Sequence, residues 1–103
     1  MFDLTNRVAV VTGASSGLGK QMAMALAQQG ADLVIMARRM ERLEALKAEI
    51  EAKGVKCLPL CSDITDSKQV DTAAAAAEGE YGRVDILVNC ADAVKSGGVL
   101  DMV

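Results

Sequence analysis

The chain has 103 residues, no histidine, 2% aromatic residues and a formal net charge of −3. A chain of this length builds one modest core at most, so we expect one domain, or part of one, over residues 1–103. The acidic balance argues against nucleic acid as a partner, and the lack of histidine excludes Ser-His-Asp catalysis and the commonest zinc sites. No apolar run approaches the about 20 residues of a membrane span, and the N-terminus lacks the features of a secretory signal. We therefore expect a cytoplasmic protein with no membrane or metal partner.

The chain carries three cysteines, Cys57, Cys61 and Cys90, and no Cys-x-x-Cys pair. Cys57 and Cys61 fall in one strand-like segment, about 13 Å apart, which is too far for one disulfide or one metal ion. We expect buried, reduced thiols, as is usual in the cytosol.

Strand-like and helix-like segments alternate along the chain. The strand-like segments are short apolar runs at residues 7–12, 32–36, 55–61 and 84–89. The Asp66-Ser67 pair predicts a cap for the third helix, and Gly30, Gly54 and Gly82 end the three helices.

The helix-like segments carry apolar side chains at helical spacing. In the first helix these are Leu18, Met22, Ala25 and Leu26. In the second, from about Met40 to Lys53, they are Leu43, Leu46 and Ile50. In the third they are Val70, Ala74, Ala77 and Tyr81.

This alternation predicts an α/β fold with a doubly wound parallel sheet, because strands separated by helices pair in parallel through right-handed crossovers. Pro59 cannot donate to a central ladder, so the third strand belongs at a sheet edge. The strand order is then 3-2-1-4, with the first two of three helices on one face and the third on the other. One helix underprotects that second face, and Ile86-Leu87-Val88 forms an exposed apolar edge suited to self-association.

The segment Thr12-Gly13-Ala14-Ser15-Ser16-Gly17-Leu18-Gly19 follows the first strand and opens the first helix. Its glycines let the backbone approach a pyrophosphate, and the N–H groups of the helix start favour the negative charge. An ordinary tight turn is the alternative, but the position between a strand and a helix favours a dinucleotide loop. A nucleoside-triphosphatase phosphate loop does not fit, because Ala14 and Gln21 stand where that motif needs glycine and a hydroxyl residue.

The second strand ends in Ala37-Arg38-Arg39, where a carboxylate would bind a ribose 2′-hydroxyl and repel a 2′-phosphate. Two arginines suit the phosphate, so we expect NADP(H) in preference to NAD(H). A charge-assisted contact of ~1.5–3 kcal/mol gives a preference of roughly ten- to a hundredfold. The alternative is that both arginines neutralise Glu41 and Glu44.

Two further strand ends carry polar candidates. After the third strand, Asp63 would accept a hydrogen bond from the adenine amino group and Ile64 would line the adenine pocket; alternatively, Asp63 is a turn or capping residue. Asn89 either ties the end of the fourth strand to its neighbours or lies beside the cofactor ribose.

Three of these features together resemble the N-terminal half of a short-chain dehydrogenase/reductase over about residues 4–91: the Thr12-Gly13-x-x-x-Gly17-x-Gly19 loop, Asp63, and Asp85-Ile86-Leu87-Val88-Asn89-Cys90-Ala91. The resemblance implies a truncated Rossmann-like fold that binds a dinucleotide cofactor. It places the pyrophosphate and adjacent ribose on the loop, at Gly13, Ser15, Ser16, Gly17, Leu18 and Gly19. It also assigns the 2′-phosphate to Arg38 and Arg39, the adenine to Asp63 and Ile64, and the nicotinamide-side ribose to Asn89 and Ala91.

The sequence departs from the family pattern in two places. Asp92 replaces a glycine that permits close approach of the cofactor. The family's catalytic Ser and Tyr-x-x-x-Lys pair have no counterpart, because the one tyrosine, Tyr81, is followed four residues later by Asp85. We therefore expect the NADP(H)-binding part of an alcohol/carbonyl oxidoreductase that has no catalytic residue and is inactive alone, with its small-molecule substrate bound only by a full-length form. A non-catalytic nucleotide-binding or assembly module, or an inert truncated fragment, is the alternative.

Overall fold

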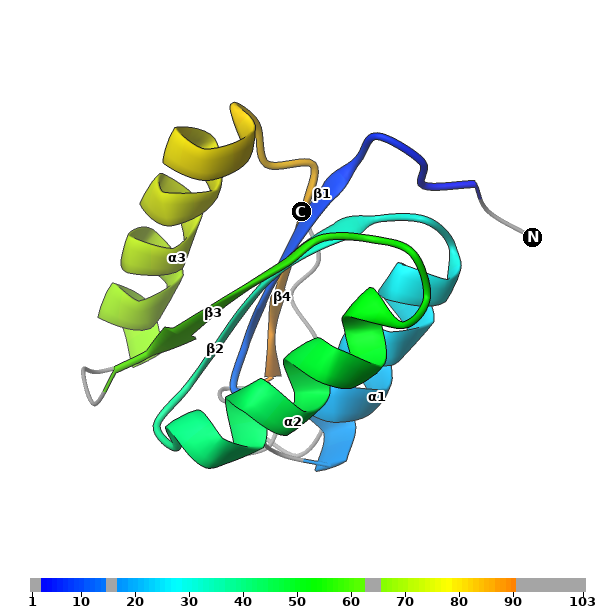
Figure 1. The fold of residues 1–103 in the computed structure, drawn as a ribbon. Coiled ribbons are helices and arrows are strands. Elements are labelled where there is room, and N and C mark those ends of the chain that lie inside the picture. The colour runs from blue at the N-terminus through cyan, green and yellow to red at the C-terminus, as the bar shows by residue number, and fades with distance from the viewer. Residues whose placement is uncertain (1–2, 15–16, 63–65, 91–103) are drawn as a thin grey trace.

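A computed structural model describes residues 3–14, 17–62 and 66–90, in which strands and helices alternate (Figure 1). The strands are β1 (Val8–Thr12), β2 (Asp32–Ala37), β3 (Cys57–Cys61) and β4 (Ile86–Asn89), and the helices are α1 (Gly17–Gln28), α2 (Met40–Glu51) and α3 (Asp66–Tyr81). Every pairing is parallel and the order is β3-β2-β1-β4, so the predicted topology is confirmed. Within the described residues, no helix has the length and apolarity needed to cross a membrane.

The two faces of the sheet carry separate cores, with α1 and α2 on one face and α3 on the other (Figure 1). Alternate strand residues enter each core. Ala9, Val11, Leu33 and Ile35 pack with the apolar side of α1 and α2, whereas Val8, Val10, Val34 and Met36 pack with α3. Because both faces are covered, the central strands β1 and β2 are continuous apolar runs. The predicted placement of the three helices is confirmed.

The buried sides of α1 and α3 differ from those predicted. In α1, Leu26 is buried and Leu18 and Met22 are half-buried against the core as predicted, but Ala25 is exposed and Gly19, Ala23 and Ala27 are buried instead. In α3, Ala73 rather than Val70 or Ala74 joins Ala77 and Tyr81 against the sheet. Small side chains occupy these positions because they let the helix axis approach the sheet closely. A prediction based on the spacing of large apolar residues therefore misses these positions.

Several element boundaries also differ from the predictions. β3 begins at Cys57 and β4 at Ile86, so the apolar Val55 and Val84 lie outside the ladder although both pack against the core. α2 ends at Glu51 rather than Lys53, and the chain then turns through Gly54 at φ 92°. The apolar runs extend to Val55 and Val84 because these two side chains are half-buried against the core just before the strands begin.

Pro59 lies in β3, which pairs only with β2 in the described part of the sheet. The Leu33 N–H donates to the Lys56 carbonyl oxygen at 2.8 Å and the Ser62 N–H donates to the Ala37 carbonyl oxygen at 3.0 Å. Even-numbered residues of β3 therefore bond to β2, and the nitrogen of Pro59 faces outward. The missing N–H costs no ladder bond, and the predicted edge position is confirmed.

β4 forms the other edge of the described sheet. The Asp85 N–H donates to the Val8 carbonyl oxygen at 2.9 Å, so the backbone groups of Ile86 and Val88 face away from β1. The side chains are less exposed than predicted, because Val88 is fully buried and Ile86 and Leu87 are half-buried between the two layers. The prediction of an exposed edge is therefore wrong for Val88.

α1 packs directly on the loop that leaves β1. A Cβ built at Gly19 would fall on the Gly13 carbonyl oxygen and within 2.8 Å of the Ala14 Cα. A Cβ built at Gly17 would meet no atom within 4 Å. The first turn of α1 therefore depends on glycine at position 19 and not at position 17.

Asp85 joins the beginnings of β1 and β4. Its Oδ2 accepts a hydrogen bond from the Val8 N–H at 2.8 Å. Its Oδ1 accepts one from Arg83 Nη2 at 2.7 Å and lies 3.5 Å from Arg7 Nη1. The Arg83 hydrogen bond, followed by the Val8 N–H, lowers the pKa of Asp85 below its usual range.

We expect Gly19→Ala to lower the free energy of unfolding by about 1–3 kcal/mol, because the added methyl group forces the loop backbone to move. Gly17→Ala is the matched control, since its methyl group enters open space and gains the same helix propensity, up to about 1 kcal/mol. Urea unfolding at equilibrium measures both variants. Equal stability of the two would contradict the close packing of α1.

We expect Asp85→Asn to destabilise the protein at neutral pH and to reduce its sensitivity to acid. A carboxyl group whose pKa is lowered by folding stabilises the fold above its unfolded pKa of about 3.9, and this contribution is lost as the pH falls through the folded pKa. The difference from wild type should therefore shrink below about pH 4. Denaturant unfolding over the acid range measures it, with Asp71→Asn on the exposed side of α3 as control. A difference that stays constant with pH would contradict the assignment.

Candidate functional site

The carboxyl ends of the four strands lie at one edge of the sheet, which we call the carboxyl edge; the strands end there at Thr12, Ala37, Cys61 and Asn89. α1 and α2 begin near this edge, so the positive ends of their dipoles point toward it. The chain winds from β1 toward β2 and β3 on one side and returns to β4 on the other. In doubly wound sheets, ligands bind outside the carboxyl ends at this reversal point.

The loop between β1 and α1 lies beside the point where the strand order reverses. It turns at Gly13, whose φ of 67° is a conformation that favours glycine. The Ala14 N–H donates to the Met36 carbonyl oxygen at 3.0 Å and fixes the loop to β2. Gly19 brings the first turn of α1 onto the loop, and the space beside Gly17 is open. This arrangement fits a ligand with an anionic group that needs close backbone approach.

Thr12 and Asn89 connect the ends of β1 and β4. The Thr12 hydroxyl donates to Asn89 Oδ1 at 3.0 Å, and both side chains are buried. Of the two predicted roles for Asn89, the structure shows the tie between neighbouring strands. Sequence reasoning did not single out Thr12. The signal was available in the predicted strand order, because the parallel register pairs Thr12 with Asn89.

Arg38 and Arg39 are exposed residues directly after β2, at the carboxyl edge. Arg39 is the N-cap residue of α2 and its side chain forms no capping hydrogen bond. Among the residues that the structure describes, no ion pair joins Arg39 to Glu41 or Glu44. Neutralisation of these glutamates therefore does not account for Arg39.

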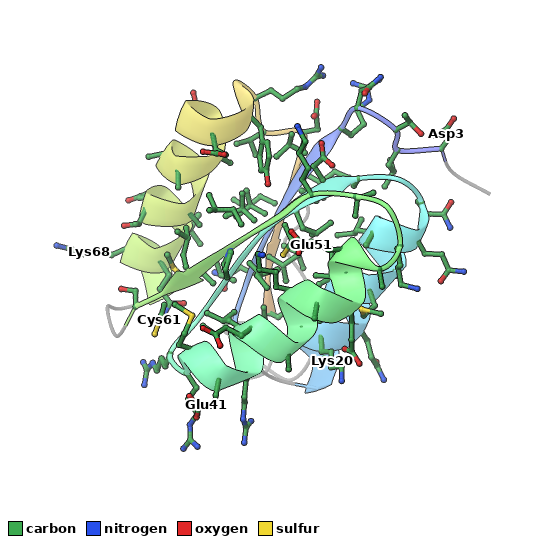
Figure 2. The ribbon with its side chains drawn as sticks, viewed as in Figure 1. Asp3, Lys20, Glu41, Glu51, Cys61 and Lys68 are labelled. Atoms are coloured by element: carbon green, nitrogen blue, oxygen red, sulfur yellow. The ribbon has the colours of Figure 1, made fainter. Side chains whose placement is uncertain are left out.

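The thiols occupy two kinds of environment. Cys57 and Cys90 are buried as predicted, and burial raises the pKa of Cys57 to about 12 and also raises that of Cys90. The expectation of burial is wrong for Cys61, which is exposed because it ends an edge strand (Figure 2). Its Sγ donates to the Arg38 carbonyl oxygen at 3.3 Å. Cys61 thus connects the end of β3 to the arginine segment, which spacing alone did not indicate.

Tyr81 lies far from the carboxyl edge. It ends α3 and donates from its hydroxyl to the carbonyl oxygen of Leu33, near the beginning of β2, at 3.3 Å. Burial is the largest cause that raises its pKa to about 12. A hydroxyl that is bonded to backbone and titrates this high is unsuited to proton transfer at neutral pH.

Gln69 is a buried polar residue that sequence reasoning missed. Its Nε2 donates to the Ser62 carbonyl oxygen at 3.4 Å, so α3 contacts the segment that follows β3.

Several predictions lie outside the described residues and side chains. They are the cofactor contacts of Ser15, Ser16, Asp63, Ile64 and Ala91, the departure at Asp92, and the capping side chains of Asp66 and Ser67. Across the described ranges, no three His, Cys, Asp or Glu residues gather as potential metal ligands.

Two curated relatives share much of this chain. A glycine betaine reductase of Emericella nidulans is 52% identical over 88 residues, which is 85% of this chain and 7% of the relative. A short chain dehydrogenase of Pseudocercospora fijiensis is 41% identical over 98 residues, 95% of this chain and 32% of the relative. The chain thus spans a third or less of the length of either relative.

Solved structures with this fold include proteins with bound cofactor. A metagenomic short-chain oxidoreductase in complex with NADP superposes with a TM-score of 0.72 at 38% identity, covering 82% of this chain and 38% of the other. An NAD+-bound xylitol dehydrogenase gives a TM-score of 0.70 at 26% identity, covering 82% and 32%. A short-chain type dehydrogenase/reductase from Mycobacterium marinum gives a TM-score of 0.74 at 40% identity, covering 84% of this chain and 35% of the other.

The sequence model of the short chain dehydrogenase family matches residues 7–102, almost the whole chain. The glycine loop, the reversal of strand order beside it and the polar strand ends are the parts of the structure that fit this match. The chain belongs to the short-chain dehydrogenase/reductase family.

Proposed function

We propose that the carboxyl edge binds NADP(H) as part of an oxidoreductase that transfers hydride between the nicotinamide and an alcohol or carbonyl substrate. The observation that carries this proposal is the packing of α1 on the Gly13–Ala14 backbone through Gly19. When bound, the cofactor would supply the hydride, and the residues present would hold and orient it.

The proposed contacts divide by cofactor group. The loop residues Gly13, Gly17, Leu18 and Gly19, with Ser15 and Ser16, would hold the pyrophosphate and its ribose, because backbone N–H groups there can donate to phosphate oxygens. Asn89, oriented by the Thr12 hydroxyl, would lie beside the nicotinamide-side ribose together with Ala91. Asp63 and Ile64 would contact the adenine.

The preference for NADP(H) rests on the residues after β2. Ala37 offers no carboxylate to a ribose 2′-hydroxyl, and Arg38 and Arg39 follow it at the surface. Because one structural relative is solved with NADP and another with NAD+, the shared fold is compatible with both cofactors. The arginines therefore supply the discrimination that we propose.

We also propose that these residues bind cofactor without turning over substrate. The one tyrosine in the sequence is Tyr81. Its hydroxyl donates a hydrogen bond to the Leu33 carbonyl oxygen near the beginning of β2, at the end of the strands away from the carboxyl edge. A general acid must reach the reacting oxygen. Carbonyl reduction would then require a Tyr-x-x-x-Lys pair that these 103 residues do not contain.

We expect the chain to bind NADPH more tightly than NADH by about ten- to a hundredfold, and Arg38→Asp to abolish or reverse this preference. Calorimetric titration of both cofactors, up to about 1 mM, measures the affinities, with NADPH absorbance after addition of a carbonyl substrate as the check on turnover.

Lys53→Asp is the matched control, because it makes the same change of charge on an exposed residue just after α2. It should leave the preference unchanged. Failure of the wild-type chain to bind either cofactor at about 1 mM would contradict the proposed function. An unchanged preference in Arg38→Asp would contradict the 2′-phosphate assignment alone.

We propose, as a second role, that the β4 edge mediates self-association. The outward backbone groups of Ile86 and Val88 have no strand partner in the described sheet, and neither proline nor charge interrupts them. By contrast, Pro59 interrupts the corresponding row on β3. Rows of backbone groups without a strand partner pair with strands from other chains where they are accessible; in this structure Ile86 and Leu87 are half-buried and Val88 is buried.

We expect a concentration-dependent dimer in sedimentation velocity that is lost in Ile86→Lys, because charge on an edge strand opposes pairing. Leu58→Lys is the matched control, since Leu58 is a half-buried residue on the opposite edge strand. A monomer at all concentrations, or equal loss of dimer in both variants, would contradict this role.

A further inference from the structure

The buried polar side chains of the described residues all lie at the carboxyl edge. They are Thr12, Gln69 and Asn89. Thr12 and Asn89 bond to each other, whereas Gln69 lies near the start of α3, on the side of the helix that also buries Ala73 and Ala77. Burying an amide costs free energy unless it is hydrogen-bonded, so a glutamine on this alanine face indicates a specific contact.

The amide of Gln69 holds the backbone where the chain leaves β3. Its Nε2 donates to the Ser62 carbonyl oxygen at 3.4 Å, and the Ser62 N–H donates to the Ala37 carbonyl oxygen at 3.0 Å. Ser62 is therefore bonded to the end of β2 through its N–H and to α3 through its carbonyl oxygen. Figure 2 shows Lys68, near the start of α3, and Cys61, at the end of β3, at the same end of the sheet.

The contact reaches the carboxyl edge from the α3 side of the sheet. α3 covers the face opposite to α1 and α2, so Gln69 is separated from the glycine loop by the sheet itself. An apolar side chain of the same length would pack against the sheet without an amide to satisfy, but it would leave the Ser62 carbonyl oxygen without this donor. Packing alone therefore does not account for the amide.

We propose that Gln69 is a positioning residue for recognition of the adenine base. The inference rests on the proposed function, which assigns the adenine to Asp63 and Ile64, the two residues that follow Ser62 in the sequence. A peptide group is planar, so a bond to the Ser62 carbonyl oxygen also orients the N–H side of the same peptide, which belongs to Asp63. A carboxylate that accepts from one amino group needs a defined direction, because hydrogen bonds weaken steeply as they bend.

The test compares NADPH with reduced nicotinamide hypoxanthine dinucleotide phosphate, in which a carbonyl oxygen replaces the adenine amino group. We expect the wild-type chain to bind NADPH at least about tenfold more tightly than this analogue, the effect of one hydrogen bond to a charged acceptor. Gln69→Met keeps the length of the side chain and removes the donor, and it should lower this ratio of Kd values by about three- to tenfold. It should change the ratio between NADPH and NADH by less than about twofold, because both arginines remain.

A ratio of Kd values separates positioning from stability, because partial unfolding raises every apparent Kd by the same factor. Gln28→Met is the matched control, since Gln28 is an exposed glutamine on α1, and it should leave both ratios unchanged. An equal loss of affinity for all three dinucleotides in Gln69→Met, or no loss, would overturn the inference and leave the proposed function standing. Equal binding of NADPH and the analogue by the wild type would do the same. If the wild type binds none of the three, the proposed function fails and this inference fails with it.

A second measurement tests the contact without cofactor. In NMR spectra of the free wild-type chain, the side-chain amide protons of Gln69 should exchange with solvent more slowly than those of Gln28, because one amide is buried and bonded to Ser62 and the other is exposed. Exchange at equal rates would overturn the positioning contact whatever the cofactor titrations show.

Discussion

The absence of a side chain at Gly19 is the constraint on which the carboxyl edge depends. It lets the first turn of α1 lie against Gly13 and Ala14, and the Ala14 N–H in turn fixes the loop to β2. The end of β1, the end of β2 and the start of α1 are thereby held together by backbone contacts. Main-chain contacts hold this part of the carboxyl edge together, so specificity for one ligand over another has to come from the side chains around it.

In the function that we propose, charged side chains at the start of α2 supply this specificity. The aligned peptide dipoles attract any anion to this edge, but they do not distinguish one phosphate from another. Arg38 and Arg39 lie at the junction of β2 and α2, and the function that we propose assigns the 2′-phosphate to them. Arg38 and Arg39 thus place two exposed positive charges directly after β2, although the chain as a whole is acidic.

The sequence predicts the topology because each rule involved acts locally. Alternating segments, right-handed crossovers and Pro59 lead to one strand order, and that order is observed. The buried faces of the helices were predicted less well. Ala23 and Ala73 lie where the close approach of helix and sheet requires a small side chain, and a pattern of large apolar residues does not mark such positions. For the site, glycine spacing indicated the loop. The Thr12–Asn89 bond and the exposure of Cys61 depend on contacts between distant segments, which spacing within one segment does not reveal.

The pairing of β1 with β4 is closed at both ends by side-chain hydrogen bonds, Val8 with Asp85 and Thr12 with Asn89, and each spans 77 residues of sequence. Loop-closure entropy grows with the length of chain enclosed, so these two contacts carry a larger entropic cost than contacts within one strand–helix unit. The neighbouring β1–α1–β2 unit needs far shorter closures. The hydrogen bond between Thr12 and Asn89 therefore exists only when β4 is docked on β1, so this part of the carboxyl edge depends on joining two segments from near opposite ends of the described chain.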